Sequence, residues 1–253
     1  MQLSTMNGIA IKQYEQAASD IGCDVAAILA VAKVESNCRG FLKQGCPKIR
    51  FERDRFEHDV SASQKMTADD LDQSNSPEIY HSCKTKTYGH LQKAMSIDKD
   101  YAFKCTSWGL FQVMGFNYSL AGFDNIDNFV SSMKESELNQ LQAFVHLISN
   151  GDMQTNHYRH LQDALCKKYW LAFSIGYNDL KQQERTYYDM YLKAYYKVFS
   201  VQLALNDRGI WVGIDGDESP QTRSALKVYQ ERVGLRVDGM LGISTLQSLD
   251  IVV

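Results

Sequence analysis

Residues 26–41 read AAILAVAKVESNCRGF, and this stretch decides how the rest of the chain is interpreted. Val25, Ile28 and Ala32 are apolar residues at helical spacing. Glu35 comes seven residues after Ile28, so on a helix its carboxyl shares their core-facing side. Burial disfavours the charged form of a carboxyl group and raises its pKa, which suits a general acid near neutral pH. A lone glutamate at a helix end is more often solvated or salt-bridged, so Glu35 needs support from other motifs.

Two further motifs follow Glu35 and Ser36 along the chain. Residues 106–118 read TSWGLFQVMGFNY, and residues 173–178 read FSIGYN. The order Glu-Ser, then S-x-G-L-x-Q, then Tyr-Asn resembles the lysozyme superfamily, particularly goose-type lysozymes and soluble lytic transglycosylases. Longer stretches are similar to the N-acetylmuramidase domain of bacteriophage endolysins: VAKVESNCRGFL, PKIRFERDRF, TSWGLFQVMGFNY and SELNQLQAFVHLI. The resemblance covers about residues 7–197 and implies a lysozyme-like helical domain that cleaves peptidoglycan.

This resemblance also implies roles for particular residues. Glu35 is expected to protonate the glycosidic oxygen as the catalytic acid. Gly109 is expected to let the backbone approach the glycan closely. Trp108 could stack on a sugar ring, although a buried tryptophan more often belongs to a core. The residues expected to bind substrate are Ser107, Trp108, Gln112, Asn117, Tyr177 and Asn178.

Hydrolysis of a glycosidic bond commonly uses a second carboxylate, and Glu52 is the candidate for this role. It lies in the segment 48–53, where apolar and polar residues alternate, so a short β-hairpin near residues 48–55 could place Glu52 in the cleft. The neighbouring Arg50, Arg53 and Arg55 offer the alternative of a structural ion pair. The sequence leaves both interpretations of Glu52 open.

The C-terminal part of the chain contains an internal repeat. Residues 214–226 read IDGDESPQTRSAL, and residues 237–249 read VDGMLGISTLQSL, which is the same D-G-x5-T-x3-L pattern at an offset of 23 residues. The pattern predicts a tight Asp-Gly turn that leads into a capped helix, twice. It resembles the peptidoglycan-binding domain type 1, a three-helix module, over about residues 198–250. A small helical dimerisation module is the alternative.

The resemblance implies a wall-binding role for eight residues of this module: Asp215, Gly216, Thr222, Tyr229, Gln230, Asp238, Gly239 and Thr245. The first turn departs from the family pattern. It continues as Asp217-Glu218-Ser219-Pro220, where a small or apolar residue followed by glycine is usual.

Length and periodicity indicate a mainly α protein of two domains, residues 1–197 and 198–253. The predicted helices span residues 7–20, 24–36, 89–104, 125–135, 137–149, 157–168, 169–177 and 184–200. The last of these is expected to bury one face, formed by Tyr187, Tyr191, Ala194 and Val198. Residues 61–87 are polar and are predicted to form a long surface excursion.

Net charge is −3 with scattered lysine and arginine, which argues against a nucleic-acid partner. The opening segment lacks the features of a secretory signal, and no apolar run is long enough for membrane insertion. We therefore expect synthesis in the cytosol and reduced thiols at all six cysteines: Cys23, Cys38, Cys46, Cys83, Cys105 and Cys166. His157 and His160 have no H-E-x-x-H pattern or third ligand beside them, so neither a metal nor an organic cofactor is expected.

These observations predict a muramidase that hydrolyses the β-1,4 bond between N-acetylmuramic acid and N-acetylglucosamine. A bacteriophage endolysin is the expected context: a monomer made in the host cytoplasm, released by a separate holin, and acting on peptidoglycan in the periplasm to lyse the host. One alternative is a lytic transglycosylase, which would use the muramoyl C6 hydroxyl instead of water and leave 1,6-anhydro ends. A non-catalytic peptidoglycan-binding protein is the other alternative.

Overall fold

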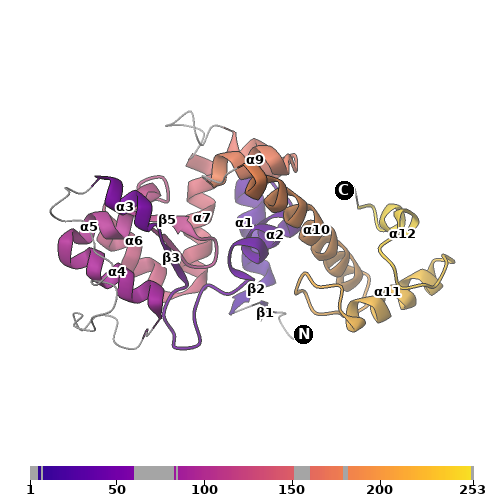
Figure 1. The fold of residues 1–253 in the computed structure, drawn as a ribbon. Coiled ribbons are helices and arrows are strands. Elements are labelled where there is room, and N and C mark those ends of the chain that lie inside the picture. Colours follow the sequence, from indigo (N-terminus) through magenta and orange to yellow (C-terminus); the bar gives the residue numbers. More distant parts are fainter. Residues whose placement is uncertain are drawn as a thin grey trace. The chain divides into compact units, whose positions relative to one another are not determined.

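The computed structural model describes residues 5–6, 8–59, 83, 85–150, 160–178 and 182–251. Helices dominate these residues, as the sequence predicts (Figure 1). The chain divides into two compact units, Met1–Cys38 with Thr155–Val253, and Arg39–Gln154. None of the described helices combines the length and the apolar character that a membrane span requires.

The first unit is built around a buried helix, α2. Its helices are α1 (Ile11–Ile21), α2 (Val25–Ser36), α8 (Leu161–Cys166), α9 (Trp170–Tyr177), α10 (Gln182–Asp207), α11 (Pro220–Arg232) and α12 (Ile243–Ser248). A two-residue strand, β1 (Thr5–Met6), pairs with β2 (Ile9–Ala10) ahead of α1. Every residue from Ala26 to Lys33 is buried. Because α2 is apolar on all sides, it is covered all round and does not present the one-sided stripe that the sequence predicts.

Helix α10 packs along both α2 and α9. Its buried residues include Tyr188, Leu192, Tyr196 and Phe199. The predicted face is wrong at three of its four residues, since Tyr187 is 60% exposed and Tyr191 and Ala194 are also exposed, whereas Val198 is buried as predicted. Tyrosines occur in both helical phases of this segment, so the pattern of residues does not reveal which phase is buried.

The second unit combines a small sheet with helices. Its elements are β3 (Ile49–Phe51), α3 (Arg53–Asp59), α4 (Lys86–Ile97), α5 (Lys99–Lys104), β4 (Thr106–Trp108), β5 (Val113–Met114), the 3-10 helix η4 (Gly115–Asn117), α6 (Ile126–Glu135) and α7 (Glu137–Asn150). The strand order is β3-β4-β5, and both pairings are antiparallel.

Two predictions of elements in this unit need correction. The hairpin near residues 48–55 is wrong, because residues 53–59 are helical and Arg50 pairs with Ser107, far along the sequence. The predicted helix 89–104 is two helices, because the Asp98 side chain accepts a hydrogen bond from the backbone N–H of Tyr101 at 2.9 Å and starts a new helix there.

The sequence predicts reduced thiols in the cytosol and leaves open whether they pair after release. Cys46 and Cys83, 37 residues apart in the sequence, form a disulfide within the second unit. The other four cysteines are thiols. Sequence spacing cannot show which cysteines become neighbours after folding, which is why the pair was missed. Most of the predicted excursion at residues 61–87 lies outside the described residues.

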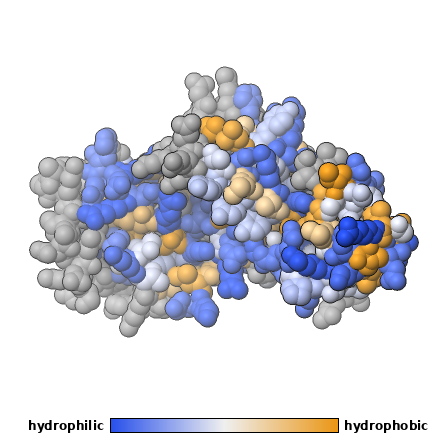
Figure 2. Space-filling model, turned by 45° about the vertical axis from the view of Figure 1, so that its right-hand side comes forward, coloured by the Kyte–Doolittle hydropathy of each residue, from blue (hydrophilic) through white to orange (hydrophobic). Residues whose placement is uncertain are grey.

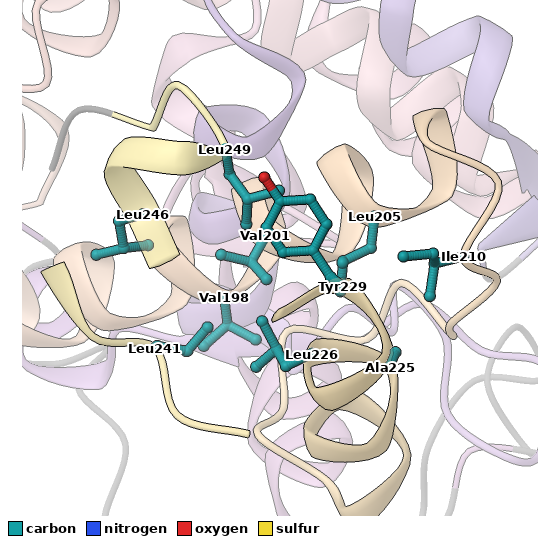
Figure 3. Close-up of a cluster of buried hydrophobic side chains, with 10 residues drawn as sticks. All are labelled: Val198, Val201, Leu205, Ile210, Ala225, Leu226, Tyr229, Leu241, Leu246 and Leu249. Atoms are coloured by element: carbon teal, nitrogen blue, oxygen red, sulfur yellow. The ribbon is translucent and has the colours of Figure 1, made fainter. Parts of the chain in front are cut away.

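The C-terminal module consists of three helical segments, as predicted, but the first is not separate. The last part of α10 packs with α11 and α12 around one apolar cluster (Figure 3). This cluster contains Val198, Val201, Leu205, Ile210, Ala225, Leu226, Tyr229, Leu241, Leu246 and Leu249. The predicted domain boundary between residues 197 and 198 thus falls inside the continuous helix α10.

Each Asp-Gly turn of the repeat is held by a buried glutamine. The amide oxygen of Gln230 accepts from the backbone N–H groups of Asp238 (3.1 Å) and Gly239 (2.8 Å), and its amide nitrogen donates to Asp238 and Thr245, both at 3.1 Å. Gln202 makes the equivalent four hydrogen bonds in the first copy. A glutamine amide suits this position because it both donates and accepts.

Gln230→Ala should therefore destabilise the protein by about 2–4 kcal/mol, because it leaves buried turn groups without hydrogen-bond partners. Urea denaturation followed by circular dichroism would measure this loss. Glu231→Ala, at the exposed neighbouring position of the same helix, is the matched control. Equal stabilities of the two variants would contradict the structural role of Gln230.

Candidate active site

Glu35 lies in the last turn of α2, at the edge of the buried part of that helix. The helix ends at Asn37, which adopts a left-handed conformation with φ of 55°. The backbone N–H of Cys38 reaches back to the carbonyl oxygen of Ala32 at 3.0 Å and closes the helix end. Glu35 is half-buried.

Two side chains donate hydrogen bonds to the same oxygen of Glu35. The Asn178 amide nitrogen lies 2.9 Å from Oε1, and the Tyr188 hydroxyl lies 2.5 Å from it. Asn178 follows the last residue of α9, and Tyr188 lies on the buried face of α10. The structure thus brings together residues that are 143 and 153 positions from Glu35 in the sequence.

Tyr188 is the functional candidate that the sequence analysis missed. Burial, and then the neighbouring Glu35 carboxylate, raise the pKa of Tyr188 well above 10. The phenol therefore keeps its proton at any physiological pH and acts as a donor to Glu35. The signal in the sequence was weak, because Tyr188 stands beside Tyr187 and only packing distinguishes them.

Tyr177, the other half of the Tyr-Asn motif, has a different environment. Its ring stacks on that of Phe173, with ring centroids 5.1 Å apart. The motif therefore contributes Asn178 directly to the acid, and its tyrosine packs on Phe173 and lies near enough to Tyr188 to raise the pKa of that residue.

Glu52 belongs to the second unit and forms an ion pair. Its Oε1 lies 2.7 Å from the Nε of Arg50, which is exposed. Its backbone N–H donates to the carbonyl oxygen of Cys105 at 2.9 Å, next to β4. This is the ion-pair arrangement that the sequence offered as the alternative to a catalytic role for Glu52.

The β4–β5 hairpin and the η4 helix that follows it carry the predicted substrate residues of the second unit. Gln112, in its turn, has φ of 49°, and its amide nitrogen donates to the carbonyl oxygens of Gly109 (2.7 Å) and Lys48 (3.2 Å). Ser107 and Asn117 are largely buried. Trp108 is fully buried, with its indole N–H directed at the carbonyl oxygen of Phe103, so its ring serves the core and offers no face to a sugar.

A neighbouring side chain explains why residue 109 is a glycine. Gly109 has φ of 74°, and a Cβ at this position would lie 2.4 Å from Cδ of Gln140. Gln140 is buried, and its amide oxygen accepts from the backbone N–H of Leu110 at 2.7 Å. The close approach at Gly109 is therefore to Gln140 of α7, which the sequence analysis did not single out.

A third acidic residue, Glu137, was also missed. It is the first residue of α7, and its Oε1 accepts from the backbone N–H of Gly40 at 2.6 Å. Burial raises the pKa of Glu137. Its presence in the family-like stretch SELNQLQAFVHLI was the available signal in the sequence. Its hydrogen bond to Gly40 gives it a role in positioning the segment that follows α2.

The eight residues expected to bind the wall serve the turns and core of the module. The polar side chains of Asp215, Thr222, Gln230, Asp238 and Thr245 take part in the glutamine-centred networks, with Gly216 and Gly239 at the turns. Tyr229 is buried and its hydroxyl donates to the carbonyl oxygen of Ser248 at 2.7 Å.

Apolar side chains are available to a ligand on the module surface. Three of the exposed ones are Trp211, Met240 and Ile243. Figure 2 shows hydrophobic areas between hydrophilic ones on this module, at the right of the view. These side chains are exposed, whereas the turn residues predicted to bind the wall make hydrogen bonds within the module.

The departure from the repeat at Asp217 has a structural explanation. Its carboxylate lies 2.9 Å from the ammonium of Lys33, whose side chain is only 8% exposed on α2. The same ammonium lies 5.6 Å from the centre of the Tyr195 ring. Asp217 thus compensates a nearly buried charge two residues before Glu35.

Within the described part of the chain, no group of three or more histidine, cysteine, aspartate or glutamate side chains is arranged to hold a metal ion. His157 lies outside the described residues. His160 precedes α8 in a left-handed conformation.

Comparisons with known proteins identify the family of the chain. The sequence matches the N-acetylmuramidase family over residues 24–200 and the peptidoglycan binding domain family over residues 196–249. No curated protein matches the chain significantly. The crystal structure of an endolysin from the Burkholderia phage AP3 is similar, with a TM-score of 0.55, 28% sequence identity, and coverage of 73% of this chain and 68% of that chain. This chain therefore belongs to the N-acetylmuramidase family of peptidoglycan-degrading enzymes and carries a peptidoglycan-binding domain in its C-terminal part.

Proposed function

We propose that this enzyme is a phage endolysin that hydrolyses the β-1,4 bond between N-acetylmuramic acid and N-acetylglucosamine, with Glu35 as the general acid. The observation that carries the proposal is the pair of donors, Asn178 and Tyr188, directed at Oε1 of a half-buried carboxyl group. Family membership and the wall-binding module support peptidoglycan as the substrate.

The two hydrogen bonds support one position for the acidic proton. Because Oε1 already accepts from Asn178 and Tyr188, the proton of neutral Glu35 is placed on Oε2. Transfer of this proton to the glycosidic oxygen leaves a carboxylate, and both donors then stabilise its negative charge. Tyr188 and Asn178 therefore act as positioning residues that orient the acid and favour its product state.

The group that completes the reaction distinguishes hydrolysis from transglycosylation. In a hydrolase, water attacks the sugar and a second group activates it. Glu52 remains our candidate for that group, although its ion pair with Arg50 also suits an enzyme that needs no second carboxylate. The alternative is therefore a lytic transglycosylase, in which the muramoyl C6 hydroxyl takes the place of water.

The same comparison supports a proposal for the biological context. The similar AP3 protein is a phage endolysin. By analogy, we propose a monomer that is made in the host cytoplasm, passes the inner membrane through a separate holin, and acts on periplasmic peptidoglycan to lyse the host. In this context the Cys46–Cys83 disulfide would form after release, because the cytosol keeps thiols reduced.

Digestion of purified sacculi followed by mass spectrometry tests the reaction. We expect reducing muramic acid ends, and we expect Glu35→Gln to lower their release about 100-fold or more, since a general acid typically contributes that much. Glu52→Gln is measured beside it, with circular dichroism as a control for folding. Anhydro ends, with Glu52→Gln fully active, would establish the transglycosylase instead; no released glycan would contradict both reactions.

Tyr188→Phe tests the positioning role. Loss of one hydrogen bond to a charged carboxylate costs about 1.5–3 kcal/mol, so kcat should fall roughly 10- to 100-fold with little change in KM. Tyr187→Phe is the matched control, because the exposed neighbouring phenol faces away from the core. A change confined to KM, or an equal effect of both variants, would remove Tyr188 from this role.

A further inference from the structure

A cavity of about 470 Å³ lies in the first unit, away from Glu35. It is lined by residues from the start of α2, the segment between α8 and α9, the C-terminal half of α10, and the chain end after α12. Asp24 stands at the start of α2 and Glu35 in its last turn, so about 16 Å of helix separates them. The cavity joins residues of the muramidase domain to residues of the C-terminal module, and the proton transfer at Glu35 does not use it.

One wall of the cavity presents an ion pair from the muramidase domain. The Lys168 ammonium lies 2.8 Å from the carboxylate of Asp24, and the Tyr196 hydroxyl donates to the same carboxylate at 2.9 Å. Burial alone would raise the pKa of Asp24, but hydrogen bonds from Lys168 and Tyr196 outweigh it and lower that pKa. Although Asp24 is the N-cap residue of α2, its side chain does not cap the helix. Its charge is directed to Lys168 and the cavity instead.

Other residues of the lining come from the C-terminal module. Arg208 and Asp250 form a longer ion pair of 3.5 Å, and both side chains are accessible. Asp207, the last residue of α10, is also exposed, and no ion pair to it is found among the described residues. This part of the lining therefore offers one cation and two anions to a ligand.

The backbone at two of these charged residues is strained. Lys168 has φ of 59° and Asp250 has φ of 61°, each just after a short helix, where glycine is the favoured residue. This left-handed conformation is less favourable for a residue with a side chain than for glycine. Both positions line the same cavity.

The chemistry of the lining limits the ligand. The Tyr196 ring is 5% exposed and has the Lys168 ammonium 5.6 Å from its centre, so it offers no face for a sugar to stack on. Three aspartates against two cations disfavour a polyanion. Short apolar side chains in the lining, Val25, Ala26 and Ala204 among them, suit small aliphatic groups. A short peptide that carries both a carboxylate and an ammonium group matches these features.

We propose that this cavity binds the peptide part of peptidoglycan, with Arg208 holding a peptide carboxylate and Asp207 and Asp250 holding an ammonium group. The proposal rests on the proposed function, since it names a second part of the same substrate. It gives the enzyme a peptide subsite that is separate from the glycan site at Glu35, at the place where its two family domains meet.

Isothermal titration calorimetry on the full chain with Glu35→Gln tests the subsite directly. The probe is the tetrapeptide L-Ala-γ-D-Glu-meso-diaminopimelate-D-Ala, which carries both kinds of charge. We expect saturable binding that Arg208→Gln weakens about tenfold or more, because a charge-assisted hydrogen bond is lost. Asp250→Asn should weaken it in the same direction. Arg236→Gln, which removes an exposed arginine outside the cavity, should leave the affinity unchanged.

Kinetics with the active enzyme separates this proposal from the proposed function. Arg208→Gln should raise KM for glycan strands that carry peptide. It should not change KM for strands from which an amidase has removed the peptide. Absence of tetrapeptide binding, or equal affinities of Arg208→Gln and Arg236→Gln, would overturn the subsite even if both substrates are cleaved. Failure of the wild type to cleave either substrate would overturn the proposed function, whatever the calorimetry shows.

Discussion

The packing of α10 against α2 is the contact on which the catalytic site and the C-terminal module both depend. Helix α2 is buried from Ala26 to Lys33 and carries Glu35 in its last turn, so it needs a cover that also provides polar partners for the carboxyl group. Helix α10 provides Tyr188 for this purpose in its first half. Its second half supplies Val198, Val201 and Leu205 to the core of the C-terminal module. One helix therefore supports both parts of the enzyme.

Buried glutamines solve the same structural problem three times. Gln140, Gln202 and Gln230 are each buried, and each accepts a hydrogen bond from the backbone of a turn. Each turn contains a glycine with positive φ. Such turns expose backbone N–H groups that require partners once they are buried. The amide oxygen of a glutamine on a neighbouring helix can accept hydrogen bonds from these N–H groups, while its amide nitrogen donates to other groups and fixes the side chain.

The ion pair between Lys33 and Asp217 gives a physical meaning to a departure from the sequence repeat. Lys33 is nearly buried on α2, and a buried ammonium without a counter-ion would be strongly destabilising. The first turn of the module supplies the carboxylate, where the second copy has Met240. The two copies of the repeat are thus alike in their turns and differ at the position where Asp217 of the first copy pairs with Lys33 of α2.

The sequence by itself determined the mainly α fold, the duplicated Asp-Gly turns, Glu35 as the candidate acid and Asn178 as a residue of its site. These features depend on local periodicity and on short motifs, which are visible in one dimension. Tertiary structure alone decided that Tyr188 and not Tyr187 meets the acid, that Cys46 pairs with Cys83, and that Asp217 pairs with Lys33. Each of these contacts joins residues that are far apart in the chain. The packing of whole helices decides which distant residues become neighbours, and the local sequence pattern carries no information about it.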